Sequence, residues 1–215
     1  WPGNVGDLGS EAAGVRTERG YVTVDEELRT STPGIYAAGD VTGRMMLVQS
    51  ATYEARIAAE NAVAGEHLRA THGAVPHGGF TDPEYGGVGL TESQARQQEA
   101  CVVALVPYAD LDRAVIDDRR EGFFKLIVAR SSRRILGAHV VGEQATEVAQ
   151  LVAAAMAARA RVEALAQLEL AYPTFTAIVG LAARQIVREL GVVKLAPAWR
   201  ALLEPRAAEG ERSGD

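Results

Sequence analysis

The pattern of apolar and polar positions in the first part of the chain predicts two short strands and one helix. Residues 21–25 are rich in β-branched and aromatic side chains, and a second apolar run, residues 35–38, follows a turn signal at residues 31–34. Beyond Met46, apolar residues recur at helical spacing as far as Gly65. The predicted order is therefore strand, Gly-Asp loop, helix.

Residues 66–79 lack periodicity and carry three histidines, so we interpret them as a linker at a domain boundary. Alternation and helical spacing return beyond this segment. The elements expected there are strands over 84–90 and 101–108, a helix over 92–98 capped by Thr91, a hairpin with arms over 122–130 and 134–142, and helices over 143–158 and 173–189. This mixture of strands and helices favours the α+β class.

These boundaries predict three parts of the chain. Residues 1–75 form a first domain segment with its linker, and residues 76–190 form a second domain. Residues 191–215 form a tail that we expect to be partly disordered, because its composition turns to Glu, Arg, Gly and Ser. The chain begins at Trp1 with neither an initiator methionine nor a signal peptide, so we expect it to be a piece of a longer protein.

Composition and charge argue against several classes of function. The 215 residues are 47% apolar, and 22 basic against 28 acidic side chains give a net charge of −6, which does not favour nucleic acid. The longest nearly uncharged run, residues 148–158, is about half of what a membrane-spanning helix needs. A single cysteine, Cys101, excludes an intrachain disulfide and favours a reducing, cytoplasmic setting. Because His67, His72 and His77 do not have the spacing of a helical ligand pair, we expect no metal site.

The candidate chemistry lies at Gly39 and Asp40, where the second apolar run ends ahead of the long helix. A carboxylate and the free N–H groups of a helix start would meet at one sheet edge, an arrangement that suits a polyol next to an electron-rich ring. The dipeptide alone also fits an ordinary turn. The whole string of residues 30–41, Thr-Ser-Thr-Pro-Gly-Ile-Tyr-Ala-Ala-Gly-Asp-Val, is far more specific.

This string resembles the second flavin-contacting segment of the pyridine nucleotide-disulfide oxidoreductases, a family that includes dihydrolipoamide dehydrogenase, glutathione reductase and mercuric reductase. The resemblance implies that Asp40, next to Gly39, binds the ribityl hydroxyls of FAD. It also implies that the start of the following helix, at Leu47, Val48 and Gln49, directs main-chain N–H groups at the pyrimidine edge of the flavin. A positive helix terminus suits the charge that develops on a reduced flavin.

Residues 80–92 look like the opening of the same family's C-terminal dimerisation domain. The fold implied is the C-terminal segment of a flavin domain followed by an antiparallel-sheet-plus-helices dimerisation domain. The implied homodimer forms through residues 80–190, where apolar stripes over 148–156 and 178–190 exceed what one small domain needs to cover itself.

The phosphate-binding part of such an enzyme is missing from this chain. No G-x-G-x-x-G occurs in the 215 residues, so the N-terminal FAD and NAD(P)H domains are expected elsewhere. The resemblance therefore implies FAD, with NAD(P)H as cosubstrate, in the full-length enzyme. For the isolated fragment we expect neither bound FAD nor activity.

The chain departs from the family at residues 171–177. Disulfide reductases of the family carry His-Pro-Thr and then Glu, whereas this chain has Tyr172 and Ala177. A phenol of pKa about 10 cannot take and return protons near neutral pH as an imidazole does, which argues against ordinary dithiol chemistry with this dyad. Mercuric reductases are similar in having Tyr there, and the resemblance implies that Tyr172 is a catalytic residue in the active site of the partner subunit. The alternative is that Tyr172 only packs beside the helix.

The sequence thus supports two functions. The first is the C-terminal part of an FAD-dependent NAD(P)H oxidoreductase, mercuric-reductase-like or dihydrolipoamide-dehydrogenase-like, in which metal reduction, dihydrolipoamide oxidation, quinone reduction and transhydrogenation are all open. The second is a catalytically inert dimerisation module without a bound cofactor.

Overall fold

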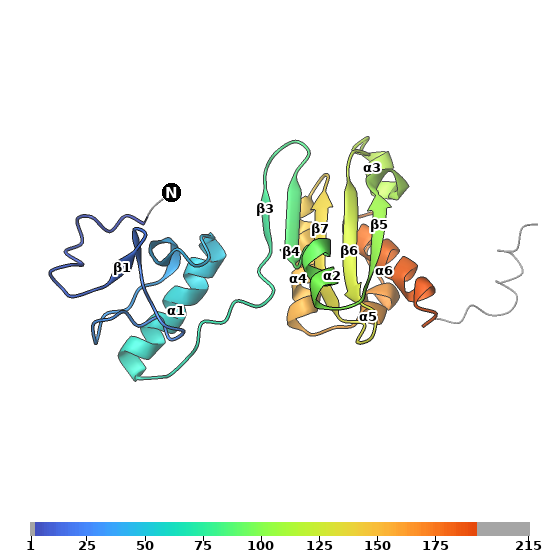
Figure 1. The fold of residues 1–215 in the computed structure, drawn as a ribbon. Helices are drawn as coiled ribbons and strands as arrows, with labels where there is room; N and C mark the ends of the chain where they lie inside the picture. Colours follow the sequence, from blue (N-terminus) through green and yellow to red (C-terminus); the bar gives the residue numbers. More distant parts are fainter. Residues whose placement is uncertain (1–2, 193–215) are drawn as a thin grey trace, which may run out of the picture. The chain divides into compact units, whose positions relative to one another are not determined.

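The computed structural model describes residues 3–192, which fall into two compact units, one ending at His77 and the other beginning at Gly78 (Figure 1). Residues 193–215, which make up most of the expected tail, lie outside the described part of the chain. No helix within residues 3–192 has the length and apolarity that crossing a bilayer requires.

The first unit is built around one long helix. Strands β1 (Thr17–Glu18) and β2 (Tyr21–Val22) form an antiparallel pair, and a short 3₁₀-helix, η1 (Gly39–Thr42), precedes α1 (Val48–Ala64). As predicted, Gly65 ends α1 in the left-handed conformation. The core of the unit consists of Leu28, Ile57, Ala58 and Ala70, with Val24, Tyr36, Ala38, Tyr53 and Leu68 packed against them.

Of the two strands expected in this unit, the first is reduced to β2 and the second, over 35–38, does not form. Tyr36 makes only an isolated antiparallel bridge with Arg29. The physical reason is a turn at Asp25, whose carboxylate accepts the N–H of Arg29 at 3.0 Å, followed by Leu28 with φ of 64°. Because this turn interrupts the partner segment, the apolar run has too little extended backbone to pair with.

Part of the segment interpreted as a linker is packed against the first unit. Ala70 is buried and donates its N–H to the Glu26 carbonyl at 2.7 Å. The side chain of Asn61, on α1, bonds both the N–H and the carbonyl of Leu68 at 2.9 Å. Tertiary contacts therefore order residues whose composition alone is typical of a linker.

The second unit is an antiparallel sheet with helices, which confirms the predicted α+β class. The strand order is β3-β4-β7-β6-β5. The strands are β3 (His77–Gly79), β4 (Tyr85–Gly89), β5 (Cys101–Pro107), β6 (Phe123–Ala129) and β7 (Ile135–Val141). The helices are α2 (Glu92–Gln98), η2 (Tyr108–Asp110), α3 (Asp112–Ile116), α4 (Ala145–Ala157), α5 (Val162–Gln167) and α6 (Ala177–Glu189). Figure 1 shows α2 in front of the sheet, and α4 and α6 behind it.

Local sequence signals account for many of these elements. Thr91 caps α2 through a reciprocal capping box with Gln94, and the β6–β7 hairpin forms where alternation predicts it. The pattern predicts neither α3 nor α5, because helices of five and six residues are too short to show a period. The last helix begins at Ala177 rather than at Pro173, since the Thr174 hydroxyl donates to the carbonyl of Ala171 at 2.8 Å and a separate turn precedes the helix.

Candidate functional site

The Gly-Asp turn of the first unit depends on a glycine at position 39. Gly39 is buried and has φ of 77°, and a Cβ added there would lie 2.9 Å from the Cβ of Ala51 on α1. Only a residue without a side chain lets the helix pack this closely against the turn. Gly43 closes η1 in the left-handed conformation and donates its N–H to the Asp40 carbonyl.

The backbone of this turn is fixed, whereas the carboxylate of Asp40 is free. The Thr42 hydroxyl donates to the Gly39 carbonyl at 2.8 Å inside the turn. Asp40 itself is exposed, and within residues 3–192 its carboxylate has no hydrogen-bond or ion-pair partner. Such a group is ready to accept hydrogen bonds from hydroxyls of a bound molecule.

The start of α1, which follows this turn in the sequence, supplies main-chain hydrogen-bond donors. Leu47 is the N-cap and provides no side-chain cap, so the N–H groups of Val48, Gln49 and Ser50 have no partner within the helix. The side-chain amide of Gln49 is already used, because it donates to the Pro76 carbonyl at 2.8 Å. The Ser50 hydroxyl is buried, at 2% exposure, and finds no hydrogen-bond partner among residues 3–192. The helix terminus therefore combines positive potential with unsatisfied polar groups.

A buried carboxylate beneath the turn is a feature that sequence reasoning missed. Glu54 on α1 is fully buried, and its Oε2 accepts the N–H of Gly39 at 2.7 Å. Its Oε1 lies 2.7 Å from Nε2 of His72, whose ring makes an edge contact with Tyr53 at 5.6 Å between centroids. His72, considered in the sequence only as a metal ligand, is thus joined through Glu54 to the candidate turn.

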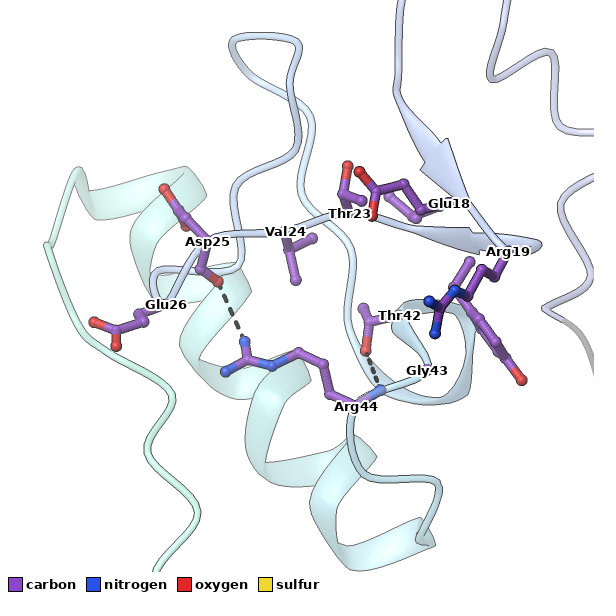
Figure 2. Close-up of a pocket in the computed structure, with 11 residues that line it drawn as sticks. Glu18, Arg19, Thr23, Val24, Asp25, Glu26, Thr42, Gly43 and Arg44 are labelled. Carbon is purple, nitrogen blue, oxygen red and sulfur yellow. Dashed lines mark hydrogen bonds between the residues drawn. The ribbon is translucent and has the colours of Figure 1, made fainter.

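A cavity of about 730 Å³ opens beside the same unit's turn at residues 42–44 (Figure 2). The Arg44 guanidinium extends along it and donates to the Asp25 carbonyl at 3.2 Å, and the Arg44 N–H donates to the Thr42 hydroxyl at 3.4 Å. Acidic and basic side chains both line the cavity, so its charge selects neither anions nor cations. Neither Asp40 nor the start of α1 lines it, so this cavity is separate from the predicted flavin contacts.

Tyr172 belongs to the second unit, ahead of α6. Its side chain is 74% exposed and lines a cavity of about 230 Å³ together with Asp112, Arg113, Ala177 and other residues. The hydrogen bond to Asp112, reinforced by the negative charge of that carboxylate, raises the pKa of the Tyr172 phenol above its usual value near 10. Position 177 offers no carboxylate to this cavity, and Asp112 on α3 provides one from another element.

Beside this cavity lies an aromatic cluster that fixes the local backbone. The Arg113 guanidinium lies 5.5 Å from the centroid of the Phe175 ring and binds Asp117 at 2.6 Å. Phe175 stacks on Tyr108 at 6.0 Å between centroids, and the Tyr108 hydroxyl donates to the Glu143 carbonyl at 2.9 Å. Burial raises the pKa of Tyr108, so this phenol stays neutral and structural.

The sequence-predicted residues divide between the two units. Gly39, Asp40, Leu47, Val48 and Gln49 all lie on η1 and at the start of α1 in the first unit, and Tyr172 lies in the second. Glu54 could have been found from sequence, because it shares the helical spacing of buried Ser50, Ile57, Ala58 and Asn61. Asp112 carries no comparable signal, since α3 has no recognisable pattern.

Comparisons with known proteins match both units. Residues 75–183 match the family described as "Pyridine nucleotide-disulphide oxidoreductase, dimerisation domain", and residues 4–55 match "Pyridine nucleotide-disulphide oxidoreductase". The chain is 36% identical over 173 residues to dihydrolipoyl dehydrogenase of Geobacillus stearothermophilus, covering 80% of the chain and 37% of that protein. It is 40% identical over 159 residues to glutathione reductase of Burkholderia cepacia, covering 73% and 35%.

Solved structures give the same result. LpdA from Mycobacterium tuberculosis matches with a TM-score of 0.79 and 34% identity over 86% of this chain and 41% of that one. The Cu(II) complex of the HOCl-induced flavoprotein disulfide reductase RclA from Escherichia coli matches with a TM-score of 0.81 and 28% identity over 86% and 43%. The chain thus spans about two fifths of the proteins it matches. Because the dimerisation-domain match alone covers about half of the chain, this protein belongs to the pyridine nucleotide-disulfide oxidoreductase family.

Proposed function

We propose that this chain is the C-terminal part of an FAD-dependent NAD(P)H oxidoreductase, in which it provides flavin contacts and the dimer interface. The observation that carries the proposal is the Gly39–Asp40 turn, which lies a few residues before an uncapped helix start and whose carboxylate has no partner within residues 3–192. The relatives named above are likewise a dehydrogenase and reductases. A cofactor-free dimerisation module is not favoured, because residues 4–55 match the family outside its dimerisation domain.

The residues present fit a flavin. The exposed carboxylate of Asp40 suits hydroxyls, and the buried hydroxyl of Ser50, which has no partner in the described part of the chain, lies in the first turn of α1. Gly39, where a Cβ would collide with Ala51, holds the turn against that helix. When bound, FAD would accept a hydride from NAD(P)H and would pass its electrons to the final acceptor.

In this proposal each element of the first unit has one task. Asp40 would accept hydrogen bonds from the ribityl hydroxyls and thereby orient the cofactor. The N–H groups at the start of α1, at Val48 and Gln49, would hold the pyrimidine edge, where the positive end of the helix would stabilise negative charge. Leu47, the N-cap, contributes its main chain to the same end of the helix.

The second unit is proposed to form a homodimer through residues 80–190. The sequence suggested a dimer interface from apolar stripes on the helices. On α6 this stripe packs inside the unit, since Ile178, Ala182 and Ile186 are fully buried. The support comes instead from apolar side chains that stay exposed on the sheet. Leu105 on β5 and Phe123 on β6 point to one face of the β5–β6 pair and are 52% and 38% exposed. A surface of this kind is typical of a partner site.

Tyr172 is proposed to act in the active site of the opposite subunit. Its side chain is 74% exposed and so accessible to a partner subunit, and the hydrogen bond to Asp112 raises the pKa of its phenol. A neutral phenol can contact an acceptor or a metal but does not exchange protons near neutral pH. Mercuric-reductase-like metal reduction and quinone reduction suit this chemistry better than histidine-dependent dithiol exchange.

The test is the FAD affinity of the full-length protein with Asp40→Ala. Loss of one charge-assisted hydrogen bond is worth roughly 1.5 to 3 kcal/mol, so FAD should bind about tenfold more weakly or worse. Glu60→Ala is the matched control, because it removes a carboxylate on α1 that is 42% exposed and pairs with Arg56. Affinity that is unchanged by Asp40→Ala would reduce the Gly-Asp element to an ordinary turn.

A further inference from the structure

We propose that Glu54 and His72 are positioning residues for the proposed flavin-binding turn at Gly39 and Asp40. His72 holds the buried carboxylate of Glu54, and Glu54 in turn holds the main chain that carries Asp40. The inference rests on the proposed function of that turn. It assigns a role to two residues that the sequence motif does not contain.

The geometry links three segments through a single side chain. Glu54 Oε2 accepts the N–H of Gly39 at 2.7 Å, and Glu54 Oε1 lies 2.7 Å from Nε2 of His72. Because an ionised carboxylate can only accept, His72 donates from Nε2. One carboxylate thus ties η1 to α1 and to the irregular segment that contains His72.

The bond to Gly39 acts directly on Asp40. The Gly39 N–H is the donor immediately before Asp40, and the same glycine has φ of 77° and no room for a side chain beside Ala51. A shift of the Glu54 carboxylate is therefore expected to move the main chain of the turn. The Asp40 carboxylate makes no contact of its own within residues 3–192, so its position depends on that turn.

Burial distinguishes this pair from the ion pairs on the surface of the same unit. The side chains of Glu54 and His72 are 0% and 13% exposed, whereas those of Arg56 and Glu60 are 59% and 42% exposed. Water can replace the partner of an exposed charge, but it cannot reach a buried carboxylate in the same way, so the loss of one partner costs more there. Removing His72 should therefore disturb the turn, and removing Glu60 should not.

The experiment is a double-mutant cycle on FAD affinity in the full-length protein. Asp40→Asn and His72→Ala should each weaken FAD binding about tenfold, and the double variant should be no more than about twofold weaker than Asp40→Asn alone. Such non-additivity is expected only if His72 acts through Asp40. His72→Gln, whose amide can still donate to Glu54, should keep most of the affinity, and Glu60→Gln is the control.

A second readout needs no cofactor. In the 215-residue chain, exchange of the Gly39 amide hydrogen should be at least about tenfold faster in His72→Ala than in Glu60→Gln, because the Glu54 acceptor is no longer held. Exchange that is equal in the two variants would overturn the inference.

The possible results separate the two proposals. If Asp40→Asn weakens FAD binding while His72→Ala has no effect or an additive one, the positioning role is wrong and the flavin site stands. If Asp40→Asn leaves FAD affinity unchanged, the proposed flavin site fails, and the positioning role toward FAD fails with it.

Discussion

Replacing Gly39 by alanine should lower the free energy of unfolding of the first unit by more than the cost of the left-handed backbone conformation alone. Gly39 has φ of 77°, a left-handed conformation that disfavours alanine by roughly 1 to 2 kcal/mol. The added Cβ would also lie 2.9 Å from the Cβ and 3.5 Å from the Cα of Ala51. Overpacking against a helix adds roughly 1 to 3 kcal/mol, so we expect a total loss of about 2 to 5 kcal/mol.

Gly34 provides a matched control in the same unit. Its φ is 80°, but a Cβ added there meets no heavy atom within 4 Å. Gly34→Ala should therefore show only the backbone effect of roughly 1 to 2 kcal/mol. The difference between the two variants measures how closely α1 approaches the turn.

The assay is amide hydrogen exchange of α1 in the 215-residue chain. Unfolding of the whole chain would mix two units, whereas the amides of buried Ile57 and Ala58 report on the first unit alone. If Gly39→Ala and Gly34→Ala accelerate their exchange equally, the contact between the turn and Ala51 is absent and the reasoning is refuted.

Three further predictions concern the second unit. In sedimentation at micromolar concentration the protein should have twice the mass of the 22.8 kDa chain, and Leu105→Asp should shift it toward the monomer; a monomeric wild type would rule out the proposed interface. In the full-length protein, Tyr172→Phe should slow turnover with the acceptor but not flavin reduction by NAD(P)H, as stopped-flow can measure; two unaltered half-reactions would make Tyr172 a packing residue. Hydrogen bonds from Lys125 and then Arg96 lower the pKa of Glu92, so the ion pair stabilises the fold above about pH 4.5 and is lost as the pH falls through the folded pKa. Glu92→Gln should therefore reduce stability at pH 7 by less than about 1 kcal/mol and not at all at acidic pH, and an equal loss at both would contradict this linkage.

Elements whose signals lie within a few residues could be predicted from the sequence. Gly65 ends α1 and Thr91 begins α2 because each needs only its immediate neighbours to do so. The apolar run at 35–38 shows the limit of this reasoning. Its alternation is typical of a strand, but strand formation needs an extended partner, and the turn at Asp25 shortens that partner to a single bridge between Arg29 and Tyr36.

The buried network beneath the candidate turn illustrates a second limit. Glu54 stands on the buried face of α1, and a carboxylate at such a position indicates a partner that the sequence does not name. That partner, His72, lies beyond the helix in a segment without periodicity, so no spacing rule joins the two. Only the folded chain brings its ring to 2.7 Å from the carboxylate.

The departure at position 177 has a different meaning in the folded chain. The spacing of the family motif places the histidine and its glutamate on one stretch of chain. By that spacing, Ala177 implies that no carboxylate accompanies position 172. The fold supplies Asp112 instead, from a helix too short to be predicted. The hydrogen bond to this carboxylate raises the pKa of the phenol, so Tyr172 is less suited than an imidazole to proton transfer near neutral pH. If Tyr172 acts in the partner's active site as proposed, the altered motif would replace a proton-transfer pair by a polar contact, and this would favour the proposed acceptors over dithiols.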